Sequence, residues 1–245
     1  MPSGLIITGA SRGIGAATAR LAARQGYPVC VNYIHDGKAA DAVVDEIRVA
    51  GGTAFAMQAD IAAAPDIIRL FDAAEAEFGA VSGLVNNAGI TGPIGVFVNA
   101  DRDVLRRVFD VNVHGSFMCA QEAVRRFSRG GKGAIVNLSS VAATTGAPGE
   151  YVHYAASKAA IEAFTLGLAR EVADAGIRVN AVAPGSTLTD IHATAGEPDR
   201  PKRVQARIPM RRLAEPAEIA EAILWLLSDA ASYVTGTVLR AGGGF

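Results

Sequence analysis

The chain has 245 residues, half of them hydrophobic, and a formal net charge of −1. That hydrophobic share supports a sizeable buried core and excludes wholesale disorder. The near-zero charge argues against nucleic acid or an anionic membrane surface as the main partner.

Cysteine usage and hydropathy indicate a soluble, cytoplasmic protein. Cys30 and Cys119 lie in apolar runs, where buried free thiols are common, and two cysteines are too few for a disulfide framework. Pro2, Ser3 and Gly4 lead directly into a strand-like run, which leaves no room for a signal peptide. No uncharged apolar stretch approaches the roughly 20 residues that span a bilayer. We therefore expect no membrane partner.

Short apolar runs alternate with longer amphipathic ones along the chain. The predicted strands are Leu5–Thr8, Val29–Tyr33, Thr53–Ala59, Gly83–Asn86, Ala134–Leu138, Arg178–Ala183 and Thr237–Leu239. Helical periodicity is found between them, near residues 14–25, 37–50, 65–78, 101–128, 154–174 and 216–228. Such alternation, with Val-, Ile- and Leu-rich strands, is typical of a parallel sheet covered on both faces. The pattern predicts an α/β fold with a Rossmann-like, doubly wound parallel sheet of about seven strands.

No linker, composition shift or internal repeat divides the chain, so we expect one dinucleotide-binding domain over residues 1–245. Residues 185–212 break the rhythm with a polar stretch that contains Pro198, Pro201 and Pro209. Loops of that length in compact domains are usually functional or poorly ordered. We expect this segment to be a substrate lid.

A glycine-rich turn joins the first predicted strand to the first helix. Gly9, Gly13 and Gly15 are spaced differently from the usual Rossmann fingerprint, but they fall where a nucleotide should bind. Small residues let the backbone approach a pyrophosphate, and the helix N-terminus offers it free N–H groups. The alternative is a tight turn that needs glycine for its own geometry.

The second predicted strand ends at Asn32 and Tyr33, where proteins selective for NAD usually place Asp or Glu. The nearest acid, Asp36, lies beyond the strand end, whereas Arg12 in the glycine turn could reach an adenosine 2′-phosphate. We favour NADP(H) as the cofactor. The alternative cofactor is NAD(H), in which case Arg12 is only a solvated side chain.

Tyr154 and Lys158 are four residues apart in a helical pattern, which puts both side chains on one face. A free phenol has a pKa near ~10, and a neighbouring ammonium lowers it towards the range of a general acid. The alternative is an exposed pair that only supports the helix.

With these features, the chain resembles the short-chain dehydrogenases/reductases over essentially its whole length. The further motifs that carry the resemblance are Asp60, the run Asn86-Asn-Ala-Gly89, Asn112, the pair Ser139-Ser140 and the pair Pro184-Gly185. Their shared order and spacing make the structural alternative for Tyr154 and Lys158 untenable.

The resemblance implies hydride transfer between NADP(H) and a carbonyl or secondary alcohol, with four residues in catalytic roles. Tyr154 would exchange a proton with the substrate oxygen, and Lys158 would lower the tyrosine pKa and hold the nicotinamide ribose. Ser140 would hydrogen-bond the substrate oxygen, and Asn112 would hold a water that links Lys158 to solvent. The implied cofactor-binding residues are Gly9, Ser11, Arg12, Gly13, Ile14, Gly15, Asn32, Asp60, Ile61, Asn87, Ala88, Gly89, Tyr154, Lys158, Pro184, Gly185, Thr187 and Thr189.

The spacing from Ser140 to Tyr154 is one residue longer than the commonest family spacing, and Ser139 is the alternative. Adjacent strand residues point to opposite faces, so only one of the two serines can face the substrate. Tyr151 is read as a residue of the pocket rim or of packing, and His153 as a neighbour of the pocket. The four histidines have no metal-ligand spacing, so we expect no metal site.

Two basic clusters are predicted to be solvated surface. They are Arg125, Arg126, Arg129 and Lys132, and then Arg200, Lys202, Arg203, Arg207, Arg211 and Arg212. The first could instead dock an acidic acyl-carrier protein, and the second could meet an anionic substrate or the cofactor phosphates. The resemblance also implies a homotetramer, with contacts through residues 101–128 and 154–174 and through Ile219–Leu227 with the C-terminal strand. An NAD-dependent sugar or alcohol dehydrogenase and a dinucleotide-binding sensor without turnover remain as alternatives, and the substrate stays open.

Overall fold

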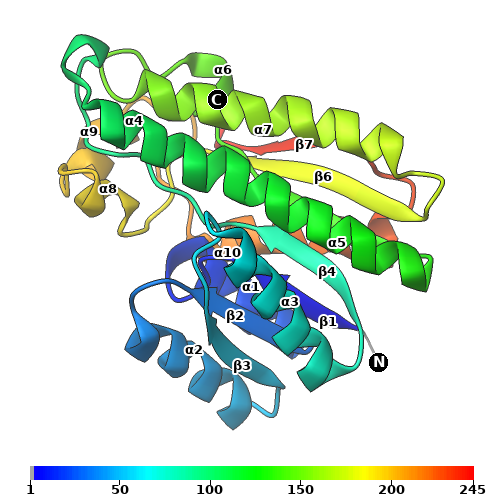
Figure 1. Cartoon of the computed structure of the whole chain (residues 1–245). Helices are drawn as coiled ribbons and strands as arrows, with labels where there is room; N and C mark the ends of the chain where they lie inside the picture. Colours follow the sequence, from blue (N-terminus) through cyan, green and yellow to red (C-terminus); the bar gives the residue numbers. More distant parts are fainter. Residues whose placement is uncertain (1–2) are drawn as a thin grey trace.

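The computed structural model describes residues 3–245. The prediction that Pro2, Ser3 and Gly4 leave no room for a signal peptide therefore falls partly on Pro2, which lies outside the described residues. Seven parallel strands form one sheet in the order β3-β2-β1-β4-β5-β6-β7 (Figure 1), which confirms the predicted fold class. The strands are β1 (Gly4–Ile7), β2 (Val29–Tyr33), β3 (Ala54–Gln58), β4 (Val81–Asn86), β5 (Gly133–Leu138), β6 (Ile177–Pro184) and β7 (Val238–Ala241).

The strands read as continuous apolar runs because both faces of the sheet are buried. Leu5, Ile6 and Ile7 of β1 are all fully buried. Leu5 and Ile7 belong to one hydrophobic cluster and Ile6 to the other, as the two-residue period of a strand requires. The sheet therefore separates two cores.

Helices cover each face of the sheet (Figure 1). The first cluster is closed by α1 (Gly13–Arg24), α2 (Gly37–Val49) and α10 (Pro216–Leu227), and the second by α3 (Ala64–Phe78), α5 (Ser116–Gly130) and α7 (Val152–Glu171). The remaining helices are η1 (Phe97–Asn99), α4 (Arg102–Phe109), α6 (Ala142–Thr145), α8 (Ile191–Thr194), α9 (Arg200–Gln205) and η3 (Asp229–Ala231). None of the helices within residues 3–245 combines the length and apolar character that crossing a bilayer requires.

The helical run predicted over residues 101–128 is not one α-helix. A π-helical turn at Asp110–Gly115 separates α4 from α5. In this turn the Asn112 side chain is bonded to the main chain of Ile90, and Gly115 packs closely on Ile61, where an added Cβ would lie 2.9 Å from the carbonyl oxygen. Single π-turns inside helices often mark functional sites.

Arg126 corrects the prediction that the first basic cluster is solvated surface. Its side chain is only 8% exposed, and its guanidinium pairs with Asp72, Glu75 and Glu122 at 2.6–2.8 Å. It also lies over the ring of Phe71. Arg126 therefore joins α3 to α5 and is not free to dock a partner.

The strand order reverses between β1 and β4, which opens a crevice at the carboxyl ends of these strands. The glycine turn, the loop after Asn86, the two serines and Gly185 follow the carboxyl ends of β1, β4, β5 and β6, in that order. Residues 185–212 begin after β6 and contain the two short helices α8 and α9 (Figure 1). The sheet thus gathers distant segments around one crevice.

Candidate active site

A cavity of about 1010 Å³ occupies this crevice. It is large for a single small-molecule pocket, which is on the order of 300–1,000 Å³. Of the four predicted catalytic residues, Ser140, Tyr154 and Lys158 line it and Asn112 lies behind the wall. All the predicted cofactor-binding residues line it except Gly15, which packs beneath.

The glycine turn between β1 and α1 presents main chain to the cavity. Gly9 has φ +61°, and a Cβ there would lie 2.9 Å from the Cα of Ala88. Asn87 braces the turn, because its Nδ2 donates to the carbonyl oxygens of Thr8 and Gly9 at 2.8 and 2.9 Å. No side chain caps the first turn of α1. Its free N–H groups and the side-chain-free turn fit a pyrophosphate.

Gly15 serves packing rather than the cavity wall. A Cβ at this position would lie 2.5 Å from Nδ2 of Asn87 and 2.6 Å from the carbonyl oxygen of Gly9. The residue must be small so that α1 can approach the loop after β4. Its effect on a bound nucleotide is therefore indirect.

At the far end of the cavity, Asn32 is turned into the protein. Its Oδ1 accepts from the N–H of Gly9 at 3.2 Å, and its Nδ2 donates to the carbonyl oxygen of Ala59 at 3.0 Å. Arg12 is exposed on the cavity wall, and no carboxylate within residues 3–245 pairs with it. Asp36 also lines the wall, where it caps α2 by accepting from the N–H of Ala39.

Asp60 lines the cavity, but its carboxylate is held by the protein. Oδ1 accepts from the N–H of Ala62 at 2.9 Å, and Oδ2 pairs with Arg107 at 3.0 Å. Arg107 comes from α4 and lines the same wall, which sequence reasoning missed. Its position next to Asp60 arises only when α4 folds across the end of β3.

Tyr154 and Lys158 occupy successive turns of α7 and are both buried. The Lys158 Nζ lies 5.7 Å from the centre of the Tyr154 ring and donates to the carbonyl oxygen of Leu138 at 2.7 Å. Burial lowers the pKa of Lys158 to about 8, so the amine remains largely protonated near neutral pH.

The pKa of Tyr154 moves up rather than down, contrary to the expectation from its spacing to Lys158. Burial raises it, and this outweighs the hydrogen bond with Ser140 and the charge of Arg200, which both lower it. The phenol is thus a proton donor at neutral pH in this structure. The cation that lowers the Tyr154 pKa is Arg200, which is distant in sequence, and its effect is smaller than that of Ser140.

The two serines at the end of β5 point in different directions. Ser139 Oγ donates to Glu162 Oε1 at 2.7 Å and faces α7. The Oγ of Ser140 accepts from the N–H of Ala142 at 3.1 Å, and Ser140 lies near enough to Tyr154 to lower the pKa of the phenol. Both serines line the cavity, but the Ser139 hydroxyl is bonded to α7, which leaves the Ser140 hydroxyl to the phenol.

Asn112 is fully buried in the π-helical turn. Its Oδ1 accepts from the N–H of Ile90 at 2.8 Å, and its Nδ2 donates to the carbonyl oxygen of Ile90 and to Ser157 Oγ. A Cβ on Gly89 would lie 3.3 Å from both Asn112 Oδ1 and Lys158 Nζ. The Asn112 side chain is therefore used to hold the loop after β4 against Lys158.

The cavity wall near Tyr154 also contains Tyr151, Arg200 and His192. Tyr151 packs edge-on against Tyr154, with ring centres 5.3 Å apart, and Arg200 lies over Tyr151 at 5.4 Å. Arg200 is only 9% exposed, which corrects its prediction as solvated surface. His192 lines the cavity as well, whereas His153 lies behind it and donates to the carbonyl oxygen of Thr91.

No group of three or more His, Cys, Asp or Glu side chains within residues 3–245 is arranged to hold a metal ion. Both cysteines are free and buried, and burial raises the pKa of the Cys119 thiol to about 12. The thiols are therefore unreactive at neutral pH.

Comparison with known proteins identifies the family. Residues 9–245 match a family model described as enoyl-(acyl carrier protein) reductase. The chain is 49% identical to the uncharacterized oxidoreductase YgfF of Escherichia coli over 98% of each chain. It is 42% identical to cis-4-hydroxycyclohexanecarboxylate dehydrogenase of Sinomonas cyclohexanicum, over 98% of this chain and 95% of the relative. It is 38% identical to the 3-oxoacyl-[acyl-carrier-protein] reductase FabG of Staphylococcus aureus, over 100% and 98%.

A crystal structure of a short-chain type dehydrogenase/reductase from Mycobacterium marinum matches this fold with a TM-score of 0.93. The two chains are 33% identical, and the match covers 99% of this chain and 94% of the other. The chain belongs to the short-chain dehydrogenase/reductase family. As a member of this family, it is an oxidoreductase of CH–OH and C=O groups that uses a nicotinamide cofactor.

Proposed function

We propose that this protein is an NADP-dependent oxidoreductase that interconverts a carbonyl and a secondary alcohol, with Tyr154 as general acid and base. The observation that carries the proposal is the position of Tyr154. Tyr154, Ser140 and Lys158 line the same cavity as the glycine turn. When bound, the nicotinamide supplies the hydride.

The residues around Tyr154 have complementary roles in this proposal. Ser140 donates to the substrate oxygen and stabilises the negative charge that develops there. Lys158 stays protonated, keeps a positive charge near the phenol and holds the nicotinamide ribose. Asn112 positions Lys158 through the loop that contains Gly89, because both ends of its side-chain amide are bonded to Ile90 and Ser157.

The preference for NADP is supported by the wall beside β2. Asn32 offers no free carboxylate or amide to the adenosine ribose, because its side chain is bonded to main chain. Arg12 is a guanidinium without an ion-pair partner in the described chain, suited to a 2′-phosphate. Replacing Arg12 with Gln should reduce kcat/KM for NADPH relative to NADH by about 10- to 100-fold. An equal effect on both cofactors would support the NAD-dependent alternative.

The test of the reaction is a substrate panel. We would mix the protein with NADPH and ketones, aldehydes, acyl-thioester mimics and an enoyl thioester, and follow nicotinamide absorbance. Two relatives named for a 3-oxoacyl reductase and a ring-alcohol carboxylate dehydrogenase make oxo thioesters and ring oxo acids the first compounds to try. Tight NADPH binding without consumption for any compound would support the sensor alternative instead.

Tyr154→Phe is the matched variant for this test. It keeps the ring against Tyr151 and removes only the hydroxyl. We expect turnover to fall by about 10²- to 10⁴-fold while the Kd for NADPH stays within about twofold. Full activity in the variant would assign the acid to another group.

We also propose a cytoplasmic homotetramer of single-domain subunits, each with a lid formed by residues 185–212. Exposed apolar side chains on the predicted pairing helices support it, among them Phe109 at 36% and Leu166 at 42% exposure. Phe117 of α5 stacks on Phe164 of α7 at 4.0 Å, which joins these helices into one surface. Light scattering coupled to size-exclusion chromatography measures the mass directly, and a monomer at micromolar concentration would contradict this assembly.

A further inference from the structure

Arg200 is a buried cation in the wall of the cavity, over the ring of Tyr151. It belongs to α9, is 9% exposed and lines the cavity. Removing a guanidinium from water is costly unless it is paired and hydrogen-bonded. Its contacts therefore show what the position is built for.

Part of the guanidinium is used by the protein. Nε and Nη2 donate to one oxygen of Glu150, at 3.2 and 2.7 Å, and Nη1 lies 3.4 Å from Nδ1 of His192. A guanidinium has five N–H donors in a fixed plane. Three of them are accounted for by these contacts, and the other two have no acceptor within residues 3–245.

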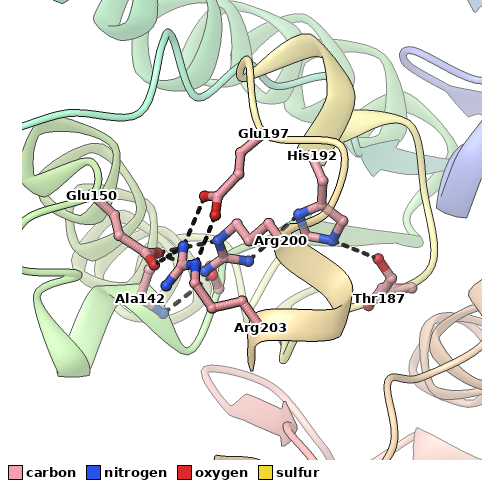
Figure 2. A network of polar contacts seen from close by, with 8 residues as sticks. Ala142, Glu150, Thr187, His192, Glu197, Arg200 and Arg203 are labelled. Atoms are coloured by element: carbon pink, nitrogen blue, oxygen red, sulfur yellow. Dashed lines mark hydrogen bonds and ion pairs between the residues drawn. The ribbon is translucent and has the colours of Figure 1, made fainter. Parts of the chain in front are cut away.

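The neighbours of Arg200 hold it in place (Figure 2). His192 Nε2 lies 3.0 Å from the carbonyl oxygen of Thr187, which only accepts, so Nε2 carries the hydrogen and Nδ1 accepts from Arg200. The second oxygen of Glu150 pairs with Arg203 at 2.7 Å, and Arg203 also pairs with Glu197. Glu150 is thereby fixed from two sides, which leaves Arg200 little freedom to turn.

Arg200 is also close to the reacting phenol. Its Cζ is 5.4 Å from the centre of the Tyr151 ring, and that ring is 5.3 Å from the ring of Tyr154. A second cation, Arg207, lines the same wall, and no carboxylate in the described chain pairs with it. A small anionic molecule could therefore contact Arg200 at one end and Tyr154 at the other.

We propose that Arg200 is the anchor for a carboxylate of the substrate, so that the enzyme acts on small oxo acids and hydroxy acids. The inference rests on the proposed carbonyl and alcohol chemistry at Tyr154. A planar carboxylate matches the in-plane N–H groups that Glu150 and His192 leave on the guanidinium. Arg200 thereby determines specificity, and the fixed distance to Tyr154 selects short acids.

The kinetic test compares an oxo acid with its neutral ester. We would measure NADPH-dependent reduction of 3- and 4-oxocyclohexanecarboxylate and of their methyl esters. We expect kcat/KM for the acids to exceed that for the esters by about 100-fold. In Arg200→Met this ratio should fall to about one, and Arg200→Lys should restore part of it.

Arg203→Gln is the matched control. Arg203 shares Glu150 with Arg200 but does not line the cavity, so its loss disturbs the same network from the outside. We expect the acid-to-ester ratio to stay within about threefold of the wild-type ratio. A collapse of the ratio in Arg203→Gln equal to that in Arg200→Met would assign the effect to the network as a whole and overturn the anchor.

A binding measurement separates this inference from the proposed reaction. Calorimetric titration of the full-length protein with cyclohexanecarboxylate, in the presence of NADP⁺, should show binding that weakens at least tenfold in Arg200→Met. The neutral cyclohexanecarboxamide should show no such difference. If neutral ketones are reduced but wild type does not prefer the acid, or binds no carboxylate, the anchor is wrong and the reaction stands. If carboxylate binds through Arg200 but no ketone is reduced, the reaction is wrong and the anchor stands.

Discussion

Two parts of the cavity wall are formed by different kinds of groups. Around the glycine turn, the wall consists of main chain and small residues that belong to the sheet and to the first turn of α1. Around Arg200, the wall consists of charged side chains carried by short helices and a loop. The first is the proposed nucleotide end and depends on close backbone approach, whereas the second is the proposed substrate end and depends on hydrogen bonds between side chains.

This difference shows where the fold can vary. A substitution at the nucleotide end has to displace backbone that also belongs to the core, because Gly9 touches Ala88 and Gly15 touches Asn87. A substitution on α9 changes which groups face the substrate and leaves the sheet intact. We therefore expect changes at the first end to affect stability and cofactor binding together, and changes at the second to alter preference.

Gly9→Ala tests the nucleotide end and should have the largest effect. The residue has φ +61°, and the new Cβ would meet the Cα of Ala88 at 2.9 Å, so neither strain nor contact can relax easily. We expect a loss of about 2–4 kcal/mol in unfolding free energy and at least a hundredfold weaker NADPH binding, measured by urea denaturation and fluorescence titration. Gly51→Ala is the control, because it shares the positive φ at +83° but has open space around it. Equal losses in both variants would contradict the role of close approach.

Ser140→Ala and Ser139→Ala test the junction of the two ends. Loss of the Ser140 hydroxyl should lower kcat/KM by about a hundredfold, because it removes a donor to the substrate oxygen. Ser139 faces Glu162 of α7, so Ser139→Ala should cost about 1 kcal/mol of stability and change kcat/KM little. Steady-state kinetics and thermal unfolding of both variants measure these effects. The reverse result would mean that β5 presents its other face to the substrate.

Lys158→Met tests how much the buried ammonium destabilises the folded protein. The folded-state pKa of Lys158, about 8, lies below the ordinary value of 10.5, so protonated Lys158 destabilises the folded protein without cofactor. We expect the free energy of unfolding of the variant at pH 7 to exceed that of wild type by about 1–2 kcal/mol, and we expect the variant to lose turnover. As the pH rises from about 8 to 10.5, the free energy of unfolding of wild type should rise relative to that of the variant. In this range Lys158 is deprotonated in the folded protein but still protonated in the unfolded chain. Urea denaturation across this range measures both, and a less stable variant at pH 7 would contradict the buried charge.

Glu150→Gln tests the substrate end and should have a smaller effect on stability than Gly9→Ala. Burial acts to raise the pKa of Glu150, but hydrogen bonds from Arg200 and Arg203 hold it below its ordinary value. The carboxylate therefore stabilises the fold above that ordinary pKa, and its contribution is lost as the pH falls through the folded-state pKa. We expect about 1 kcal/mol lower stability at pH 7, no such acid dependence, and faster hydrogen exchange in residues 191–205. Arg212→Gln removes only the exposed pair with Glu218, so it should change stability by a few tenths of a kcal/mol.

Much of the fold could be predicted because its signals are local. Val29–Tyr33 is a strand with the predicted bounds, and the helices at α1, α2 and α3 begin and end within one or two residues of the predicted ranges. Apolar runs bounded by glycine and polar residues report burial on both faces directly. The glycine turn and the Tyr154–Lys158 spacing are likewise readable, because each lies within a single turn or helix.

The rest depended on contacts between segments far apart in the chain. A pattern of helical periodicity over 101–128 does not show that Asn112 will be pulled towards Ile90, and a run of arginines does not show which one is buried. Arg126 and Arg200 look alike in sequence to their exposed neighbours. Their burial follows from acidic partners on other elements, Asp72 and Glu75 for the first and Glu150 for the second.

The amino-acid sequence by itself determined the parallel sheet, the nucleotide turn and the helix that carries Tyr154 and Lys158. These features follow from backbone conformation and from the period of apolar residues, which act over a few neighbours. Only the tertiary structure decided that Ser140 faces the cavity, that burial raises the Tyr154 pKa, and that Arg200 stands beside it. Desolvation and ion pairing depend on what surrounds a group in space, and the folded chain sets those surroundings.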